Sequence, residues 1–196
     1  MNEPSSVTLG WLGRFAQSWL PVCLLGVSLG ANVYLGIKMD HPAVVSTARI
    51  KLGDRFPVVA AETLAGNQVR LGWASNTGQT VIYVFSPTCI WCARNLANIQ
   101  ALALNRGSRF RFIGVSLTKT GLHEYLAKNN LPFPIYSIDA KTAKETKLTG
   151  TPEMIVVSRE GKVERDISGA FTGPTQKEVE AAFDIHLPGL LQKSEL

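Results

Sequence analysis

The chain has 196 residues, of which 45% are hydrophobic, and this fits one ordinary domain with an appended segment. Its formal net charge is +5, but the 20 basic residues are scattered rather than clustered, which argues against a nucleic-acid partner. Three cysteines are too few, and odd in number, for a small domain held together by disulfides.

An uncharged apolar segment lies close to the N-terminus. No charged residue occurs from Phe15 to Ile37, and roughly 20 helical residues are enough to cross the ~30 Å hydrocarbon core of a membrane. Trp19 and Tyr34 lie near its ends, where interfacial aromatic residues are common. The segment predicts one N-terminal transmembrane helix that stays attached to the protein. A cleaved signal peptide and a buried helix of the soluble domain are the two alternatives.

We therefore expect four parts: an N-terminal tail (1–14), a transmembrane anchor (15–38), a linker (39–50) and a soluble domain (51–196). Basic residues flank the anchor on both sides, with more of them after it than before it. The positive-inside rule alone would weakly favour a cytoplasmic soluble domain. Cys23 lies within the anchor, and we expect it to act as a small packing side chain.

From residue 51 onward, the pattern alternates between strands and helices. In chain order the sequence predicts a hairpin turning at 65–67, a strand at 80–85, a helix at 89–104, a strand at 111–117, a helix at 120–130, an extended segment at 135–138, a helix at 141–148, paired strands at 153–158 and 163–167, and a helix at 175–183. Thr175 and Glu178 have the spacing of a capping box at the start of the last helix. This order predicts an α/β fold whose central mixed sheet is flanked by helices.

Two cysteines with the spacing C-x-x-C stand where a buried strand passes into a helix. Cys89 opens the helix, where free backbone N–H groups and a partial positive charge favour the thiolate over the thiol. Cysteines at such positions have pKa values of roughly 3.5–7.5. Cys92 follows one turn later, so its sulfur can resolve a mixed disulfide formed at Cys89. The pair predicts thiol–disulfide exchange, with Cys89 and Cys92 as the catalytic residues.

Other roles for the pair have less support in the sequence. A zinc site needs four ligands, whereas the three histidines (His41, His123 and His186) are scattered along the chain. A structural disulfide across two residues would close a tiny loop and stabilise the fold little. A peroxidatic cysteine is the remaining alternative. We expect no bound metal and no cofactor.

Four short motifs occur in order along the soluble domain: LGDRFP at 52–57, VIYVF at 81–85, GTP at 150–152 and EGKV at 160–163. In these motifs, over about residues 51–185, the chain resembles the thioredoxin superfamily, and within it the membrane-anchored thiol–disulfide oxidoreductases of the TlpA type, a group of redoxins. The resemblance implies a thioredoxin fold. It also implies a single-pass protein of the bacterial cytoplasmic membrane whose soluble domain faces the periplasm or its equivalent, against the charge bias.

The resemblance also implies how substrate binds. Thr151 and Pro152 are expected to be joined by a cis peptide that faces the cysteines and pairs with an extended substrate segment. Trp91, in the inner dipeptide, either contacts the partner or covers the start of the helix. The expected partners are protein thiols and disulfides, together with an upstream electron donor that the sequence does not name. The direction of electron flow also stays open, although TlpA-type relatives mostly act as reductants.

Three positions depart from the pattern that the resemblance implies. A buried acid is expected six residues before the first cysteine, a Trp directly before it and a Glu three residues after the second cysteine, where this chain has Tyr83, Thr88 and Asn95. The usual proton-handling carboxylates are therefore missing. Glu153, directly after Pro152, is a hypothetical partial replacement, and an exposed glutamate at a strand end is the alternative interpretation.

Two other functions remain as alternatives. A peroxiredoxin-like thiol peroxidase would need a P-x-x-x-T-x-x-C motif, but Ile82 and Ser86 occupy the Pro and Thr positions before Cys89. A non-enzymatic copper or metal chaperone would need a histidine ligand downstream and near the site. His123 lies within a predicted helix, which is the wrong kind of segment for such a ligand.

Overall fold

The computed structural model describes residues 19, 22–32, 34, 50–73, 78–105 and 109–192. The chain divides into two units, residues 1–47 and residues 48–196.

In the first unit, the described residues 19, 22–32 and 34 are helical. Large apolar side chains on this helix, such as Leu25 and Val27, are about 70% exposed (69% and 71%). Within the described part of the chain, no helix combines the length and the apolar character that crossing a membrane requires. The predicted tail, parts of the predicted anchor and all of the predicted linker except Ile50 lie outside the described residues.

The second unit is built on one sheet with the strand order β2-β1-β5-β4-β3-β6-β7. The strands are β1 (Val59–Thr63), β2 (Gln68–Leu71), β3 (Gln79–Phe85), β4 (Phe110–Ser116), β5 (Ile135–Ser137), β6 (Glu153–Val157) and β7 (Val163–Ser168). The central strands β3, β4 and β5 pair in parallel, whereas β1–β2, β1–β5, β3–β6 and β6–β7 pair antiparallel. The predicted mixed sheet is confirmed.

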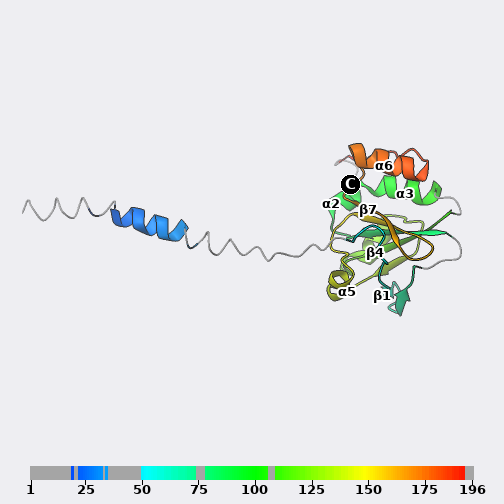
Figure 1. Cartoon of the computed structure of the whole chain (residues 1–196), viewed down its shortest axis with the longest axis horizontal. Coiled ribbons are helices and arrows are strands. Elements are labelled where there is room, and N and C mark those ends of the chain that lie inside the picture. Colours follow the sequence, from blue (N-terminus) through cyan, green and yellow to red (C-terminus); the bar gives the residue numbers. More distant parts are fainter. Residues whose placement is uncertain are drawn as a thin grey trace, which may run out of the picture. The chain divides into compact units, whose positions relative to one another are not determined.

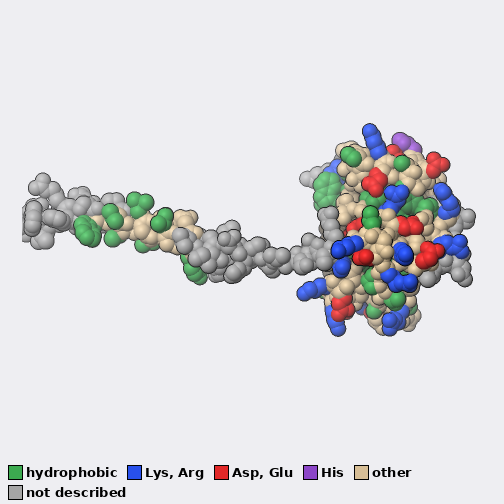
Figure 2. All heavy atoms as spheres, viewed as in Figure 1, with side chains coloured by type: hydrophobic (Ala, Val, Ile, Leu, Met, Phe, Trp, Pro, Cys, Tyr) green, Lys and Arg blue, Asp and Glu red, His purple; other side chains and the backbone are tan. Residues whose placement is uncertain are grey.

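Helices cover both faces of this sheet. They are α2 (Ile90–Arg94), α3 (Leu96–Asn105), α4 (Leu122–Lys128), α5 (Ala140–Glu145) and α6 (Gly173–Phe183). The helices α3 and α6 lie on one side of the sheet, and α5 lies on the other (Figure 1). Acidic and basic side chains are interspersed over the visible face of this unit (Figure 2).

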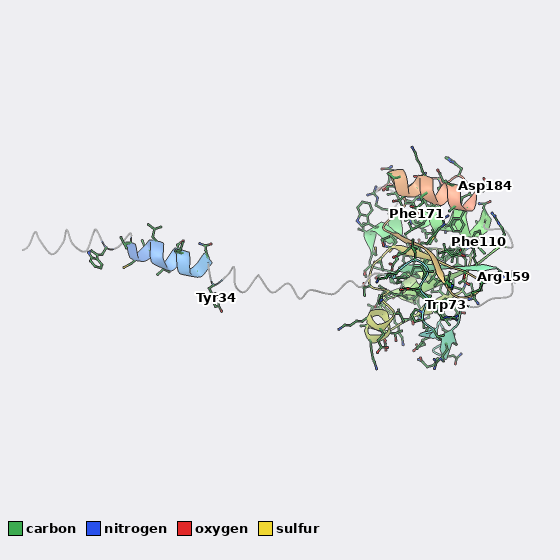
Figure 3. The ribbon with its side chains drawn as sticks, viewed as in Figure 1. Tyr34, Trp73, Phe110, Arg159, Phe171 and Asp184 are labelled. Carbon is green, nitrogen blue, oxygen red and sulfur yellow. The ribbon has the colours of Figure 1, made fainter. Side chains whose placement is uncertain are left out.

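The sheet separates two hydrophobic cores, because alternate residues of a strand point to opposite faces. We call the core on the side of α3 and α6 the site core, since it contains Cys92 as well as Tyr83 and Phe85 of β3. The core on the side of α5 is the scaffold core, which contains Ile82 and Val84 of the same strand. Phe110 and Phe171, of the site core, lie toward α6, and Trp73, of the scaffold core, lies away from it (Figure 3).

Two details of the predicted helices are wrong. The helix expected at 89–104 is interrupted at Asn95, which caps the end of α2 before α3 begins at Leu96. The capping box at Thr175 and Glu178 does not form, because α6 begins at Gly173 with Thr172 as its N-cap. Pro174 is tolerated in the first turn, where the backbone N–H has no intrahelical acceptor, so the helix extends N-terminal to Thr175.

Candidate active site

The two cysteines lie at the end of β3, where the chain turns into α2. Cys89 is the N-cap of α2, and its sulfur accepts a hydrogen bond from the backbone N–H of Cys92 at 3.3 Å. Both are free thiols; Cys89 is half-buried and Cys92 is fully buried. The structure therefore presents one sulfur toward solvent and keeps the other behind it.

Hydrogen bonds favour the thiolate of Cys89. Burial is the largest single influence and raises its pKa, but hydrogen bonds from the side chains of Cys92 and Thr151 and from the backbone amides of Cys92 and Trp91 outweigh it. The net result is a pKa below that of an ordinary cysteine. A lower pKa gives a larger thiolate fraction at neutral pH, and the thiolate is the nucleophilic form.

The pKa of Cys92 is shifted in the opposite direction, upward. Burial, followed by the hydrogen bond with Cys89, raises the pKa of Cys92 to about 12. The backbone of Ser86 and the side chain of Thr151 act in the other direction without reversing the shift. Cys92 is thus a protonated thiol at neutral pH, and it can donate a hydrogen bond to the sulfur of Cys89.

The peptide between Thr151 and Pro152 is cis, as predicted, and it faces the cysteines. The Cys89 thiol donates to the carbonyl oxygen of Thr151 across 3.5 Å. The strand β6 begins directly afterwards, at Glu153. The loop before β6 therefore places backbone groups of Thr151 and Pro152 beside the half-buried sulfur.

A groove of about 380 Å³ lies beside this loop. Trp91, Thr151 and Pro152 line it together with the last residue of β7 and four residues after it: Ser168, Gly169, Ala170, Thr172 and Thr175. Trp91 is 48% exposed, and the guanidinium of Arg94 lies 4.8 Å from the centre of its ring. The structure thus brings together all three residues that the sequence proposed for substrate binding.

The departures from the expected pattern have different structural consequences. Asn95 is buried, and its Oδ1 accepts hydrogen bonds from the side chain of Asn98 and from the backbone N–H of Phe171. Asn95 therefore joins the helix start to the segment before α6. Glu153 is paired in register with Val84, a scaffold-core residue, so strand alternation directs it away from the face that holds Cys92. The geometry does not favour Glu153 as a proton-handling group, and the alternative interpretation as an exposed glutamate is wrong, because Glu153 is only 8% exposed.

Tyr83 and Tyr125 were not among the predicted site residues, yet both lie in the site core with Cys92. Tyr83 follows the strand alternation of β3, whereas Tyr125 comes from α4, 33 residues after Cys92 in the sequence. The sequence position of Tyr125 does not indicate that it shares a core with Cys92, because a tyrosine in a helix is also typical of an ordinary hydrophobic core.

The described histidines lie apart from the cysteines. His123 is on α4, and His186 approaches the Glu180 carboxylate at 3.2 Å. His41 lies outside the described residues. Within the part of the chain that the structure describes, no group of three or more His, Cys, Asp or Glu side chains could hold a metal ion.

The sequence model of the redoxin family matches residues 51–183, which include both cysteines and the cis proline. The chain belongs to the redoxin family. Among curated proteins, it is 22% identical over 148 residues to the methylamine utilization protein MauD of Methylobacillus flagellatus, covering 73% of this chain and 72% of that protein. The predicted membership of a thioredoxin-superfamily redoxin is confirmed.

Solved structures show the same fold. A protein of Chlorobium tepidum assigned as thiol:disulfide interchange protein DsbE superposes with a TM-score of 0.57 at 22% identity, covering 69% of this chain and 96% of that one. The thioredoxin domain of the thiol-disulfide oxidoreductase BVU-2223 of Bacteroides vulgatus gives 0.54 at 17% identity, covering 69% and 99%. The expected enzyme class, a thiol–disulfide oxidoreductase, agrees with these relatives.

Proposed function

We propose that this redoxin exchanges or reduces disulfides of proteins outside the cytoplasm through Cys89 and Cys92, while held at a membrane by its N-terminal segment. The observation that carries the proposal is the asymmetry of the cysteine pair. Cys89 is half-buried with a lowered pKa, whereas Cys92 is fully buried with a raised one. One sulfur is suited to attack and the other to resolve.

The reaction follows from this asymmetry. The thiolate of Cys89 attacks a substrate disulfide, forms a mixed disulfide and releases one substrate thiolate. Cys92 then attacks the sulfur of Cys89, which forms the Cys89–Cys92 disulfide and releases the second substrate thiol. Two electrons pass from the cysteine pair to the substrate in this direction, and the reverse sequence oxidises a dithiol substrate.

The groove beside the cis proline is the proposed substrate site. Backbone groups of Thr151 are adjacent to Cys89, and an extended peptide can pair with such groups as an added strand. Exposed Trp91 provides an apolar contact at one wall of the groove. Protein thiols and disulfides fit this open site, and an upstream donor or acceptor must reset the cysteine pair after each cycle.

The membrane anchor and the location rest on the sequence. The stretch from Phe15 to Ile37 has no charged residue, and its described residues are helical with exposed apolar side chains. We assign 1–14 to a tail, 15–38 to the anchor, 39–50 to a linker and 51–196 to the redox domain. The redox domain is proposed to face the periplasm or its equivalent, on the outer side of a bacterial cytoplasmic membrane.

A trapping experiment tests the proposal. Full-length Cys92→Ala protein, in a Cys23→Ala background, cannot resolve a mixed disulfide at Cys89, so it is expected to accumulate adducts that reducing agent releases. The matched control is the same protein with Cys89→Ala added, which is expected to form none. The adducts are separated on non-reducing gels and their partners identified by mass spectrometry.

The partners also test the location. Proteins from outside the cytoplasm support it, and cytoplasmic partners alone would contradict it. If no adduct forms although Cys89 remains open to alkylation, exchange is not the function. Peroxide consumption that survives Cys92→Ala would then favour the peroxidase alternative, and copper retained through dialysis would favour a metal chaperone.

A further inference from the structure

Two tyrosine hydroxyls are buried in the site core without an ordinary hydrogen bond. Tyr83 is 1% exposed and Tyr125 is 8% exposed. Among the groups that the structure describes, neither hydroxyl oxygen has a hydrogen-bond partner of normal geometry. Buried polar groups are paired in the great majority of cases, so two unpaired hydroxyls in one core call for an explanation.

Ring contacts link both tyrosines to one residue of β3. The ring of Tyr83 stacks on that of Phe85, with centroids 5.6 Å apart and an angle of 6° between the planes. Phe85 in turn contacts Tyr125, with centroids 5.5 Å apart. All three belong to the same core cluster as Cys92, so the two phenols are held on the side of the sheet where the buried sulfur lies.

The charges of the cysteines contribute to the raised pKa values of both tyrosines. Burial is the main cause that raises the pKa of Tyr83, and the next is the charge of Cys92, which also approaches the Tyr83 hydroxyl as a hydrogen-bonding group. Burial and then the charges of Cys92 and Cys89 raise the pKa of Tyr125. Both phenols are therefore protonated at neutral pH and can donate.

The geometry points to Tyr83 and Tyr125 as hydrogen-bond donors that stabilise negative charge on the sulfur of Cys92 during the resolving step. This inference rests on the proposed function. Cys92 must become a thiolate, or nearly so, in a fully buried position where such a charge is costly. The backbone of Ser86 and the side chain of Thr151 favour the thiolate there but leave the pKa at about 12. Two uncommitted phenols supply further donors without adding a charge.

The step is balanced without any further reactant. Cys92 loses its proton and attacks the sulfur of Cys89 in the mixed disulfide, so that the bond between Cys89 and the substrate sulfur breaks. The departing substrate sulfur takes the electron pair, and the proton passes to it or, for a weakly basic thiolate, to solvent. The tyrosines keep their own protons throughout. Tyr83 is expected to be the stronger donor, because Cys92 acts on it both as a charge and as a hydrogen-bonding group, whereas it acts on Tyr125 as a charge alone.

A reaction with an aromatic disulfide separates the two steps. Reduced full-length protein in a Cys23→Ala background, solubilised in detergent, is mixed with 5,5′-dithiobis(2-nitrobenzoate), and the coloured thiolate is followed by stopped flow. Attack by Cys89 releases the first equivalent, and resolution by Cys92 releases the second. The parent is expected to show two phases, and its Cys92→Ala derivative only the first.

Tyr83→Phe is expected to slow the second phase on the order of tenfold or more, since a donor to a charged group is lost, while the first phase stays within about twofold. Tyr125→Phe is expected to slow it less. The matched control is Tyr136→Phe, on β5 against the scaffold core, which is expected to change neither phase. A second phase in Tyr83→Phe as fast as in the control would overturn the inference.

Two further outcomes keep the inference and the proposed function separable. If Tyr83→Phe does not fold, the Tyr125→Phe protein decides, and an unchanged second phase there overturns the donor role. A parent protein that releases no second equivalent would instead count against the proposed function itself, because resolution by Cys92 would then be absent before any tyrosine is altered.

Discussion

The site core and the scaffold core share the strands of one sheet but differ in what they bury. The scaffold core is filled by apolar side chains such as Ile82, Leu148 and Ile155. The site core holds the sulfur of Cys92 and the hydroxyls of Tyr83 and Tyr125 within otherwise apolar packing. Buried polar side chains also occur on the scaffold side, where strand alternation places Thr80 and Glu153, but those of the site core share one cluster with the cysteine sulfur.

Substitutions at two adjacent residues of β6, one in each core, test this comparison. They are expected to have the largest effect of those considered. Met154 and Ile155 are both fully buried, but Met154 enters the site core and pairs in register with Tyr83, whereas Ile155 enters the scaffold core. Substitution of either by Ala is expected to lower the free energy of unfolding by about 2–5 kcal/mol, since each leaves a cavity. Urea unfolding of the reduced proteins measures this.

The two substitutions are expected to differ in their effect on the rate of the resolving step. Met154→Ala removes the neighbour of Tyr83 and is expected to change the rate of the resolving step, whereas Ile155→Ala is expected to leave it unchanged under conditions where both proteins are folded. Val58→Ala, at a position that is 50% exposed, is the control for substitution as such. If Met154→Ala and Ile155→Ala changed the rate of the resolving step equally, the two cores would not be functionally distinct.

A smaller effect is expected at Asn95, which ties the site helices to the rest of the fold. Asn95→Ala leaves the buried N–H of Phe171 and the Asn98 amide without their acceptor, and it is expected to destabilise the protein by about 1–3 kcal/mol. Asn105→Ala on α3 is the matched control, because its side-chain bond to Ala101 is exposed and its loss should change little. Thermal unfolding of both variants compares them, and equal stability would contradict the structural role of Asn95.

Much of the fold could be predicted from the sequence, because it depends on local patterns. The continuous run at 80–85 indicates a strand buried on both faces, and the C-x-x-C that follows it indicates a helix start with reactive sulfurs. The cis peptide before Pro152 was predicted through resemblance rather than through any local pattern. The strand and the helix start lie within short segments, so reading along the chain is enough to find them.

The features that were missed depend on residues far apart in the sequence. The interruption at Asn95 coincides with its bond to Phe171, 76 residues away, and no helical periodicity contains that partner. The segment after α6 is similar, since the backbone N–H of Gly189 donates to the side chain of Asn98, 91 residues earlier. Tyr125 likewise shares the site core with Cys92 only because α4 packs on the face of the sheet that holds this core.

The smallest expected effect concerns the open edge of the site core, where Thr151 meets Cys89. The Thr151 side chain is one of the groups that lower the pKa of Cys89, so Thr151→Val, which replaces the hydroxyl by a methyl group, is expected to raise that pKa. As the pH rises through the pKa, the thiol becomes thiolate and alkylation accelerates to a plateau. The variant's profile should therefore shift to higher pH, with a rate near neutrality that is roughly two- to tenfold lower.

At a pH well above both midpoints, the rates of Thr151→Val and the parent should converge, because both are then fully thiolate at Cys89. The measurement is the rate of iodoacetamide alkylation against pH in the Cys23→Ala background, where buried Cys92, with a pKa of about 12, contributes little. Thr172→Val is the control, since Thr172 lines the same groove and is not among the main groups that shift the pKa of Cys89. A lower plateau with an unmoved midpoint would mean that Thr151 governs access to the sulfur rather than its ionisation.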